Sequence, residues 1–259
     1  MAGLRCGGAE HLLTAAWPIM VLVPTFSRVI HTPATITLQP CEPAVAAWGI
    51  TTPDELLQRI RILTGTPQRR PAVVAVDGRS GSGKTTLATR LQALEQGAAI
   101  LHVDDLSWNE PLYGWDEVLR QTLRQLQGTG ELDFTPPAWQ RHGRAGSLRI
   151  PAGTPMVIVE GTGSGMRAVA DLVDAHLWVQ TDENTAEERG IGRDIRAGTN
   201  GNEVESIAFW KAWMRAERPF FAADKPWERA DMIVSGEAFP ELTEGEIAWV
   251  DGPLSGPRE

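Results

Sequence analysis

A run of glycine, serine and lysine residues at positions 78–85 has the residue types and the spacing that bind phosphate. The run Gly78-Arg79-Ser80-Gly81-Ser82-Gly83-Lys84-Thr85 matches the pattern G-x-x-x-x-G-K-[ST], and Thr86 follows it. Glycines allow backbone N–H groups to approach phosphate oxygens without a Cβ in the way, and a following helix directs the positive end of its dipole at the same anion. We therefore predict that residues 78–86 bind ATP, that Lys84 neutralises charge on the β- and γ-phosphates, and that the Thr85 hydroxyl holds Mg²⁺.

The segments on both sides of this run support the phosphate-binding interpretation. Five apolar residues, 72–76, precede it as a predicted buried strand, and residues 87–91 follow it with helical spacing. A Gly/Ser-rich connector could match the pattern by chance, but the strand before it and the helix after it disfavour that alternative. The Asn-Lys-x-Asp motif of GTPases and the Leu-Ser-Gly-Gly signature of transport ATPases do not occur. The remaining functional classes are therefore a kinase or another ATPase.

Two further predicted strands end in acidic residues. Asp104 and Asp105 end one of them, and Glu160 ends the other. Because ligands of open α/β folds bind at the carboxyl ends of the strands, Asp104 could accept the proton of an attacking hydroxyl or hold a metal-bound water. Glu160 could bind a Mg²⁺ water beside Thr85. In the alternative interpretations, the acidic pair caps the next helix and Glu160 faces solvent. Asp116 is a third acidic candidate.

Basic residues that could stabilise a transferring phosphoryl group lie on a predicted helix after residue 182. Arg189 and Arg193 are four residues apart and so share one face of that helix, and Arg196 follows them. Such a helix could close over the phosphates. The alternative is a salt-bridged face exposed to solvent, since acidic residues lie nearby at Glu187, Glu188 and Asp194.

With these residues in place, the chain resembles the uridine/cytidine kinase family of P-loop kinases over residues 71–237. The family's strand-end catalytic Asp is similar to Asp104 in Asp104-Asp105-Leu106-Ser107. Its aromatic-Asp pair, which grips the nucleoside sugar, resembles Trp115-Asp116. Its aromatic segment at the nucleobase pocket is similar to the run Trp139-Gln140-Arg141-His142-Gly143-Arg144. The resemblance therefore implies that Asp116, His142 and Arg144 position a nucleoside.

Three later motifs extend the resemblance, and several departures from the family pattern leave the acceptor open. The apolar-Glu-Gly strand end, the lid motif and the late Ala-Asp-apolar strand resemble residues 159–161, 189–194 and 230–234. The departures are Leu106 after the catalytic Asp, Glu117-Val118 in place of His-Pro, Gly190 in place of an arginine, and Ala197 to Gly201 in place of Arg-Gly-Arg. Relatives of this fold also phosphorylate pantothenate, phosphoribulose and glycerate.

The resemblance implies a kinase that uses ATP and Mg²⁺ and transfers the γ-phosphoryl to a nucleoside hydroxyl. Its implied catalytic residues are Asp104, Lys84 and Arg193, its metal-binding residues are Thr85 and Glu160, and its substrate-binding residues are Asp116, His142, Arg144 and Arg189. Three alternatives stay open: a kinase for a non-nucleoside hydroxyl, a catalytically silent ATP-binding regulatory protein, and an ATPase stimulated by a macromolecular partner.

The elements that must position these residues form a predicted α/β fold. Five apolar runs separated by helical or irregular segments predict the P-loop NTPase fold, with a five-stranded parallel sheet and helices on both faces. A first helix is expected after Thr52, which with Pro53 and Glu55 has the sequence of a capping box. Residues 106–155 are the predicted acceptor-binding insertion and residues 184–205 the predicted lid. The runs lie at 72–76, 99–103, 156–159, 176–180 and 231–234.

Composition favours a small-molecule partner. The 259 residues are 42% hydrophobic and carry a formal charge of −9, which disfavours a nucleic-acid-coating protein. Residues 1–50 are predicted to be a poorly ordered leader and residues 51–259 the kinase domain. We expect a cytoplasmic location and no membrane partner, and the sequence does not determine the oligomeric state. The two cysteines, Cys6 and Cys41, have no zinc-site spacing. Trp210 and Trp213 are predicted to pack rather than to bind a base.

Overall fold

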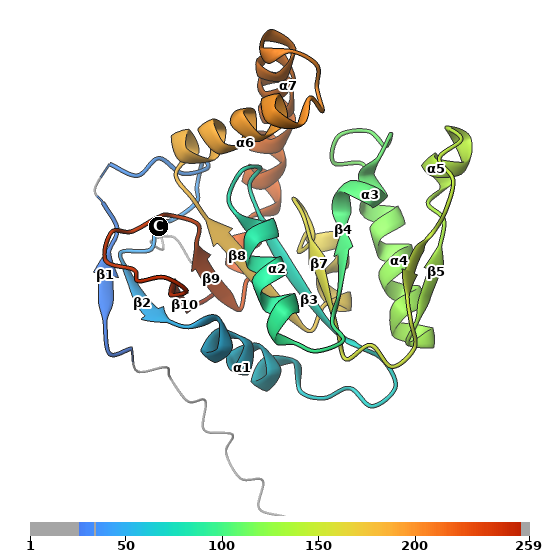
Figure 1. Ribbon diagram of the computed structural model, residues 1–259, viewed down its shortest axis with the longest axis horizontal. Helices are drawn as coiled ribbons and strands as arrows, with labels where there is room; N and C mark the ends of the chain where they lie inside the picture. Colours follow the sequence, from blue (N-terminus) through green and yellow to red (C-terminus); the bar gives the residue numbers. More distant parts are fainter. Residues whose placement is uncertain (1–25, 34, 255–259) are drawn as a thin grey trace, which may run out of the picture.

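The computed structural model describes residues 26–254 except residue 34, and its centre is a mixed sheet (Figure 1). Eight strands pair in the order β1-β2-β10-β9-β8-β3-β7-β4. The five from β9 to β4 are parallel to one another, which confirms the predicted five-stranded parallel sheet and its α/β class. These five strands are β3 (Ala72–Gly78), β4 (Ala99–His102), β7 (Met156–Glu160), β8 (Ala175–Gln180) and β9 (Met232–Ser235).

Three antiparallel strands extend the sheet beyond β9. They are β1 (Val29–His31), β2 (Ala47–Thr51) and β10 (Ile247–Asp251). The predicted leader therefore needs correction over residues 26–50, because β1 and β2 belong to the sheet and Trp48 is buried in the core. Both strands are short, and their partners lie far away in the sequence, so no local hydrophobic pattern marks them. The remainder of the predicted leader, residues 1–25, lies outside the described residues.

Helices cover both faces of the sheet. On β3, Val74 and Val76 pack into one apolar cluster with the first two helices, whereas Val73 packs into a second cluster on the opposite face. This alternation follows from the two-residue period of a strand. The first face is covered by α1 (Pro53–Thr64) and α2 (Lys84–Leu94), and the second by α4 (Asp116–Thr129), η1 (Arg167–Leu172) and α7 (Glu203–Asp224).

Helix α1 begins with the predicted capping box. The Thr52 side chain accepts a hydrogen bond from the Glu55 backbone N–H, and the Glu55 carboxylate accepts one from the Thr52 backbone N–H. These two bonds satisfy backbone donors that have no partner within the helix. The start of α1 predicted from the sequence is therefore confirmed.

The segment between β4 and β7 contains three helices and two short strands. They are α3 (Val103–Ser107), α4, β5 (Leu132–Phe134), α5 (Pro137–Arg141) and β6 (Leu148–Ile150). Strands β5 and β6 pair with each other and not with the main sheet. Helix α6 (Glu183–Ala197) and the first part of α7 lie beyond the end of the sheet at which α2 begins (Figure 1). A short helix, η2 (Pro226–Glu228), leads into β9.

No helix within the described ranges is both long enough and apolar enough to cross a membrane.

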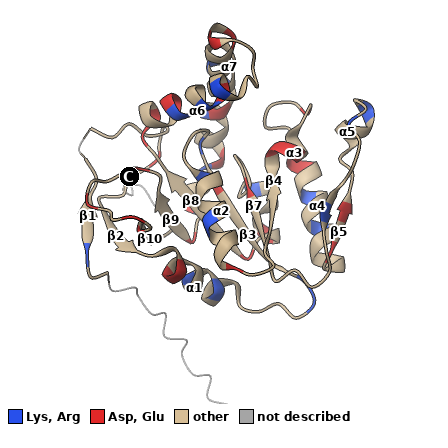
Figure 2. Cartoon of the chain, in the orientation of Figure 1, with Lys and Arg blue, Asp and Glu red and all other residues tan. Residues whose placement is uncertain are grey.

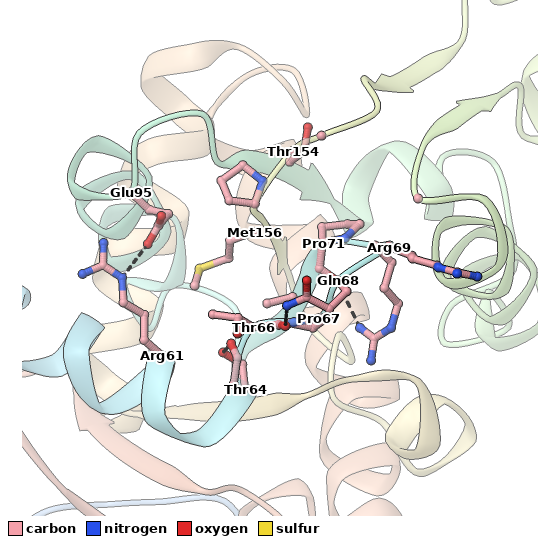
Figure 3. A pocket seen from close by; sticks show the side chains of 16 residues that line it. Arg61, Thr64, Thr66, Pro67, Gln68, Arg69, Pro71, Glu95, Thr154 and Met156 are labelled. Atoms are coloured by element: carbon pink, nitrogen blue, oxygen red, sulfur yellow. Dashed lines mark hydrogen bonds and ion pairs between the residues drawn. The ribbon is translucent and has the colours of Figure 1, made fainter.

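A cavity of about 400 Å³ lies at the amino ends of the parallel strands, where β3 and β7 begin (Figure 3). Arg61 and Glu95 form an ion pair at 2.9 Å on its wall, and Met156 and Gln68 also line it. Ligands of open α/β folds bind beyond the carboxyl ends of the strands. This cavity lies at the amino ends, so it is separate from the predicted phosphate site.

Candidate functional site

The predicted phosphate-binding loop connects β3 to α2, as its sequence pattern requires. Three of its glycines have positive φ angles, 153° at Gly78, 79° at Gly81 and 100° at Gly83. A Cβ on Gly81 would overlap the backbone oxygen of Ala186 in α6, so only glycine fits there. Lys84 is the first residue of α2, and its Nζ donates a hydrogen bond to the Arg79 backbone oxygen at 2.8 Å. The loop therefore lies at a helix N-terminus, where anions are stabilised.

A cavity of about 350 Å³ adjoins this loop and brings several predicted residues together. Lys84 and Thr85 come from the start of α2, Asp104 from the start of α3, and Glu160 from the end of β7. Helix α3, which contains Asp104 and Asp105, carries acidic red colouring beside the end of β4 (Figure 2). The pairing of β7 with β3 places Glu160 level with Val76, next to the loop. Phosphate-binding, acidic and hydroxyl groups thus line one cavity.

Thr85 and Glu160 are in direct contact. The Thr85 hydroxyl donates to Glu160 Oε1 at 3.0 Å, and His102 Nδ1 lies 2.8 Å from Glu160 Oε2. Burial alone would raise the pKa of Glu160, but the hydrogen bond with His102 and the charge of Lys84 outweigh it and hold this pKa below its usual value. The same hydrogen bond raises the pKa of His102. A hydroxyl beside a carboxylate, both oxygen ligands, is a donor set that fits Mg²⁺.

The Asp104 carboxyl lies in a setting that favours its protonated form more than water does. Although Asp104 keeps an exposed surface, the surrounding protein removes water from its carboxyl and raises its pKa, and the nearby charge of Glu160 adds to this effect. The charges of Lys84 and Arg193 oppose the increase without cancelling it. A carboxylate whose pKa is raised in this way binds a proton more readily, which suits a general base.

The two predicted lid arginines lie on α6 but line different cavities. Arg193 lines the cavity that contains Asp104, and it forms an ion pair with the buried carboxylate of Asp194 at 2.8 Å. Arg189 donates to the Gly236 backbone oxygen at 2.7 Å and lines a second cavity of about 440 Å³ with Gly83 and Thr86. The two side chains therefore line different cavities, each of which includes residues of the phosphate-binding loop.

Gly190 has a packing role in α6. A Cβ at this position would overlap the indole ring of Trp210, which is buried. An arginine therefore cannot occupy position 190 while Trp210 keeps this position. The departure from the family pattern noted in the sequence follows from the contact between α6 and α7.

The predicted substrate-binding residues of the insertion do not line the cavity that contains Asp104. Asp116 is exposed at the start of α4. Arg144 lies 3.6 Å above the ring of Trp139 and forms an ion pair with Asp105 at 2.5 Å. His142 packs edge-on against Trp108, with 6.0 Å between ring centroids. Arg144 therefore joins α5 to α3, because a stacked and paired guanidinium is held in place by these contacts.

Aromatic residues that the sequence interpretation assigned to packing also line the cavity. Phe209, Trp210 and Trp213 come from α7, and Trp108 comes from the residue directly after α3. Trp210 is buried, which agrees with a packing role, whereas Phe209 is 44% exposed. The helical spacing of these residues was visible in the sequence, but spacing alone does not show which face of α7 lies toward the loop.

Asp77, directly before the loop, is a buried residue that the sequence interpretation missed. Its carboxylate accepts backbone hydrogen bonds from Gly78, Gly163 and Gly165 at 2.7, 2.8 and 3.0 Å. His176 Nε2 lies 3.9 Å away. Burial raises the pKa of Asp77 to about 6, although the hydrogen bonds to its carboxylate lower this pKa. Burial lowers the pKa of His176 to about 3. Asp77 thus ties the first loop glycine to the segment after Glu160.

These two pKa shifts predict opposite effects on stability in mild acid. Folding raises the pKa of Asp77 from 3.8 to about 6, so its contribution favours the folded state at low pH and is lost as the pH rises through that interval. Folding lowers the pKa of His176 from 6.5 to about 3, so its contribution is lost as the pH falls through that interval. Between pH values of about 4 and 6 the two contributions oppose each other.

We expect the Asp77→Asn variant to lose stability more steeply in acid than the parent chain, because only the His176 contribution remains. The free energy of unfolding of the variant, relative to the parent, should fall by about 2 to 3 kcal/mol between pH values of about 6 and 4. Urea unfolding at both pH values measures this difference, and the exposed Asp133→Asn is the control. A variant whose stability follows that of the parent at both pH values would contradict the expectation.

Comparison with known proteins finds sequence relatives that are uridine kinases. The chain is 26% identical to the uridine kinase of Lactiplantibacillus plantarum over 206 residues, which covers 72% of this chain and 94% of that enzyme. It is 24% identical to the uridine kinase of Limosilactobacillus reuteri (strain DSM 20016), covering 70% of this chain and 88% of the relative. No family model matches the chain.

Solved structures also resemble the chain. One is described as a possible uridine kinase from Bacillus stearothermophilus, with a TM-score of 0.42, 19% identity, and coverage of 69% of this chain and 98% of that one. Another is the shikimate kinase of Bacteroides thetaiotaomicron, with a TM-score of 0.34, 15% identity, and coverage of 60% and 83%. The sequence relatives confirm the resemblance to uridine kinases that the motifs predicted.

Proposed function

We propose that this chain is a kinase that transfers the γ-phosphoryl group of ATP to a hydroxyl of a small molecule, with a nucleoside as the first candidate acceptor. The observation that carries the proposal is the single cavity lined by Lys84, Thr85, Asp104 and Glu160 beside the glycine-rich loop. Such a cavity holds the groups that phosphoryl transfer needs: a phosphate cradle, metal ligands and a base. The similarity to uridine kinases supports it.

In the proposed reaction, each group has a separate task. Backbone N–H groups of the loop and Lys84 bind the phosphates, and Arg193 adds positive charge where negative charge spreads over the transferring group. Asp104 accepts the proton of the acceptor hydroxyl as its oxygen attacks the γ-phosphorus, and the bond from that phosphorus to the bridging oxygen of ADP breaks. Thr85 and Glu160 would hold Mg²⁺, and the bound ion would neutralise part of the phosphate charge.

The two cavities beside the loop suggest where the two substrates bind. The one lined by Arg189, Gly83 and Thr86 adjoins the start of α2 and would receive the adenosine part of ATP. The one lined by Asp104 and Trp108 would receive the acceptor. In this proposal residues 106–155 act as the acceptor-binding insertion and residues 184–205 as the lid. The use of ATP favours a cytoplasmic location.

The walls of the acceptor cavity favour a flat molecule. Trp108, Phe209 and Trp213 present aromatic surface, while Asn200 and Thr162 add polar groups. Aromatic rings stack on planar bases, and the two basic residues of the cavity, Lys84 and Arg193, are assigned in this proposal to the phosphates. Asp116, His142 and Arg144 do not line this cavity, so their role in binding the acceptor stays a prediction, and a non-nucleoside hydroxyl stays the runner-up.

An assay of purified protein with Mg²⁺, ATP and a panel of nucleosides, sugar phosphates, pantothenate and glycerate tests the proposal. We expect phosphorylated product from a nucleoside, and none above background from the Lys84→Met variant. Product from an acid or a sugar phosphate alone would favour the runner-up. No product from any acceptor, under conditions in which ATP binds, would contradict the kinase proposal and favour a silent ATP-binding protein.

A further inference from the structure

The carboxylate of Glu217 contacts four parts of the molecule at one point. Glu217 lies on α7 and is completely buried. Its Oε2 accepts hydrogen bonds from the Ser80 backbone N–H at 3.0 Å, from Trp213 Nε1 at 2.9 Å and from the Tyr113 hydroxyl at 3.3 Å. Its Oε1 accepts one from Gln39 Nε2 at 3.3 Å. The donors come from the phosphate-binding loop, α7, the segment before α4 and the N-terminal segment.

A buried carboxylate in this position is not explained by packing alone. Removing an acidic side chain from water is unfavourable unless hydrogen-bond donors replace the water, and an apolar residue would avoid that loss. Here four donors replace the water, and one of them is a main-chain N–H group of the loop itself. Because a hydrogen bond to a carboxylate is stronger than one between neutral groups, Glu217 fixes the direction of the Ser80 peptide.

The same carboxylate also fixes the wall of the acceptor cavity. Trp213 lines that cavity, and its indole N–H group is held by Glu217. Tyr113 belongs to the insertion and stacks on Phe220 with 4.2 Å between ring centroids. A displacement of Trp213 or Tyr113 by a bound acceptor therefore changes the hydrogen bonds of Glu217, and with them the position of Ser80.

We propose that Glu217 is a positioning residue that couples the acceptor wall to the phosphate-binding loop, so that acceptor and MgATP affect each other's affinity through this carboxylate. The inference rests on the proposed function, since it requires ATP to bind at the loop. Coupling of this kind is reciprocal, so a change at Tyr113 must alter the affinity for MgATP, although Tyr113 is joined to the loop through the hydrogen bonds that Glu217 accepts from Tyr113 and Ser80.

A double-mutant cycle on MgATP binding tests this coupling without knowledge of the acceptor. The Kd for MgATP is measured by calorimetry for the full chain, Glu217→Gln, Tyr113→Phe and the double variant. We expect the Kd to rise about tenfold in Glu217→Gln and about threefold in Tyr113→Phe, because each removes hydrogen bonding at the carboxylate. Tyr113→Phe should have no further effect when Glu217→Gln is already present. Glu228→Gln, in a partly exposed ion pair with Lys225, is the matched control.

The outcomes separate this inference from the proposed function. A parent chain that does not bind MgATP would overturn the proposed function. If the parent binds MgATP and both Glu217→Gln and Tyr113→Phe have the same Kd as the parent, the coupling alone is overturned. The coupling is also overturned if the effects of the two substitutions on the Kd simply add in the double variant. Should Glu217→Gln not fold, Tyr113→Phe decides by itself: an unchanged Kd at an unchanged melting temperature overturns the inference, and a raised Kd at that temperature supports it.

Discussion

The Lys84→Met variant is expected to lose about 10³-fold in kcat/KM for phosphoryl transfer. The side chain is nearly completely buried at the start of α2, and its ammonium group lies where the loop would hold the β- and γ-phosphates. Methionine keeps most of the apolar stem, so the packing of α2 is retained while the charge is removed. The loss therefore reports the stabilisation of phosphate charge by Lys84 in the transition state.

The rate of ADP formation with the accepted substrate measures this loss. Lys211→Met is the control, because Lys211 is an exposed lysine on α7 and does not line the cavity. The control should keep the rate of the parent chain. A Lys84→Met variant that transfers phosphate at a rate within a few-fold of the parent would show that this lysine does not act on the transferring group.

Asp104→Asn should reduce kcat by about 10²- to 10⁴-fold and leave the KM for ATP almost unchanged. Asparagine keeps the size of the side chain but cannot take up the proton of an attacking hydroxyl. In the parent chain kcat should fall as the pH decreases through the pKa of Asp104, because only the ionised form is a base. Burial raises that pKa, so the decrease begins at a higher pH than an ordinary aspartate would give.

A pH series of kcat for the parent and for two aspartate variants measures this effect. Asp105→Asn is the matched control, since Asp105 is the next residue and forms an ion pair with Arg144 instead of lining the cavity. This control should keep both the rate and the acidic limb of the parent. If Asp104→Asn retained kcat and the same pH dependence, Asp104 would not be the base, and the regulatory alternative would gain support.

Local patterns in the sequence were sufficient to predict the phosphate-binding loop and the parallel strands. The loop conformation depends on residue types at fixed spacing, because positive φ angles at Gly78, Gly81 and Gly83 need glycine. Strands β3, β7 and β8 are buried along their whole length and therefore read as continuous apolar runs. Both signals are local, so no knowledge of the tertiary structure was needed to detect them.

Features that depend on long-range contacts could not be predicted in the same way. Strand β2 pairs with β10, whose residues lie about two hundred positions later, so its place in the sheet is not visible in its own sequence. The position of Arg144 depends on the direction in which α5 presents Trp139, and that direction is set by tertiary packing. Glu217 resembles any charged helical residue until the loop, Tyr113 and Gln39 are brought around it.

The antiparallel strands also determine where this chain can be shortened. A fragment beginning at residue 51 would lack almost all of β2 and leave β10 with an open row of backbone hydrogen-bonding groups on one side. It would also remove Glu42, whose carboxylate accepts hydrogen bonds from Trp178 and Gln180 of the central sheet. Open strand edges recruit other chains. A fragment of residues 51–259 is therefore expected to aggregate, and shortened versions of the chain should begin ahead of Val29.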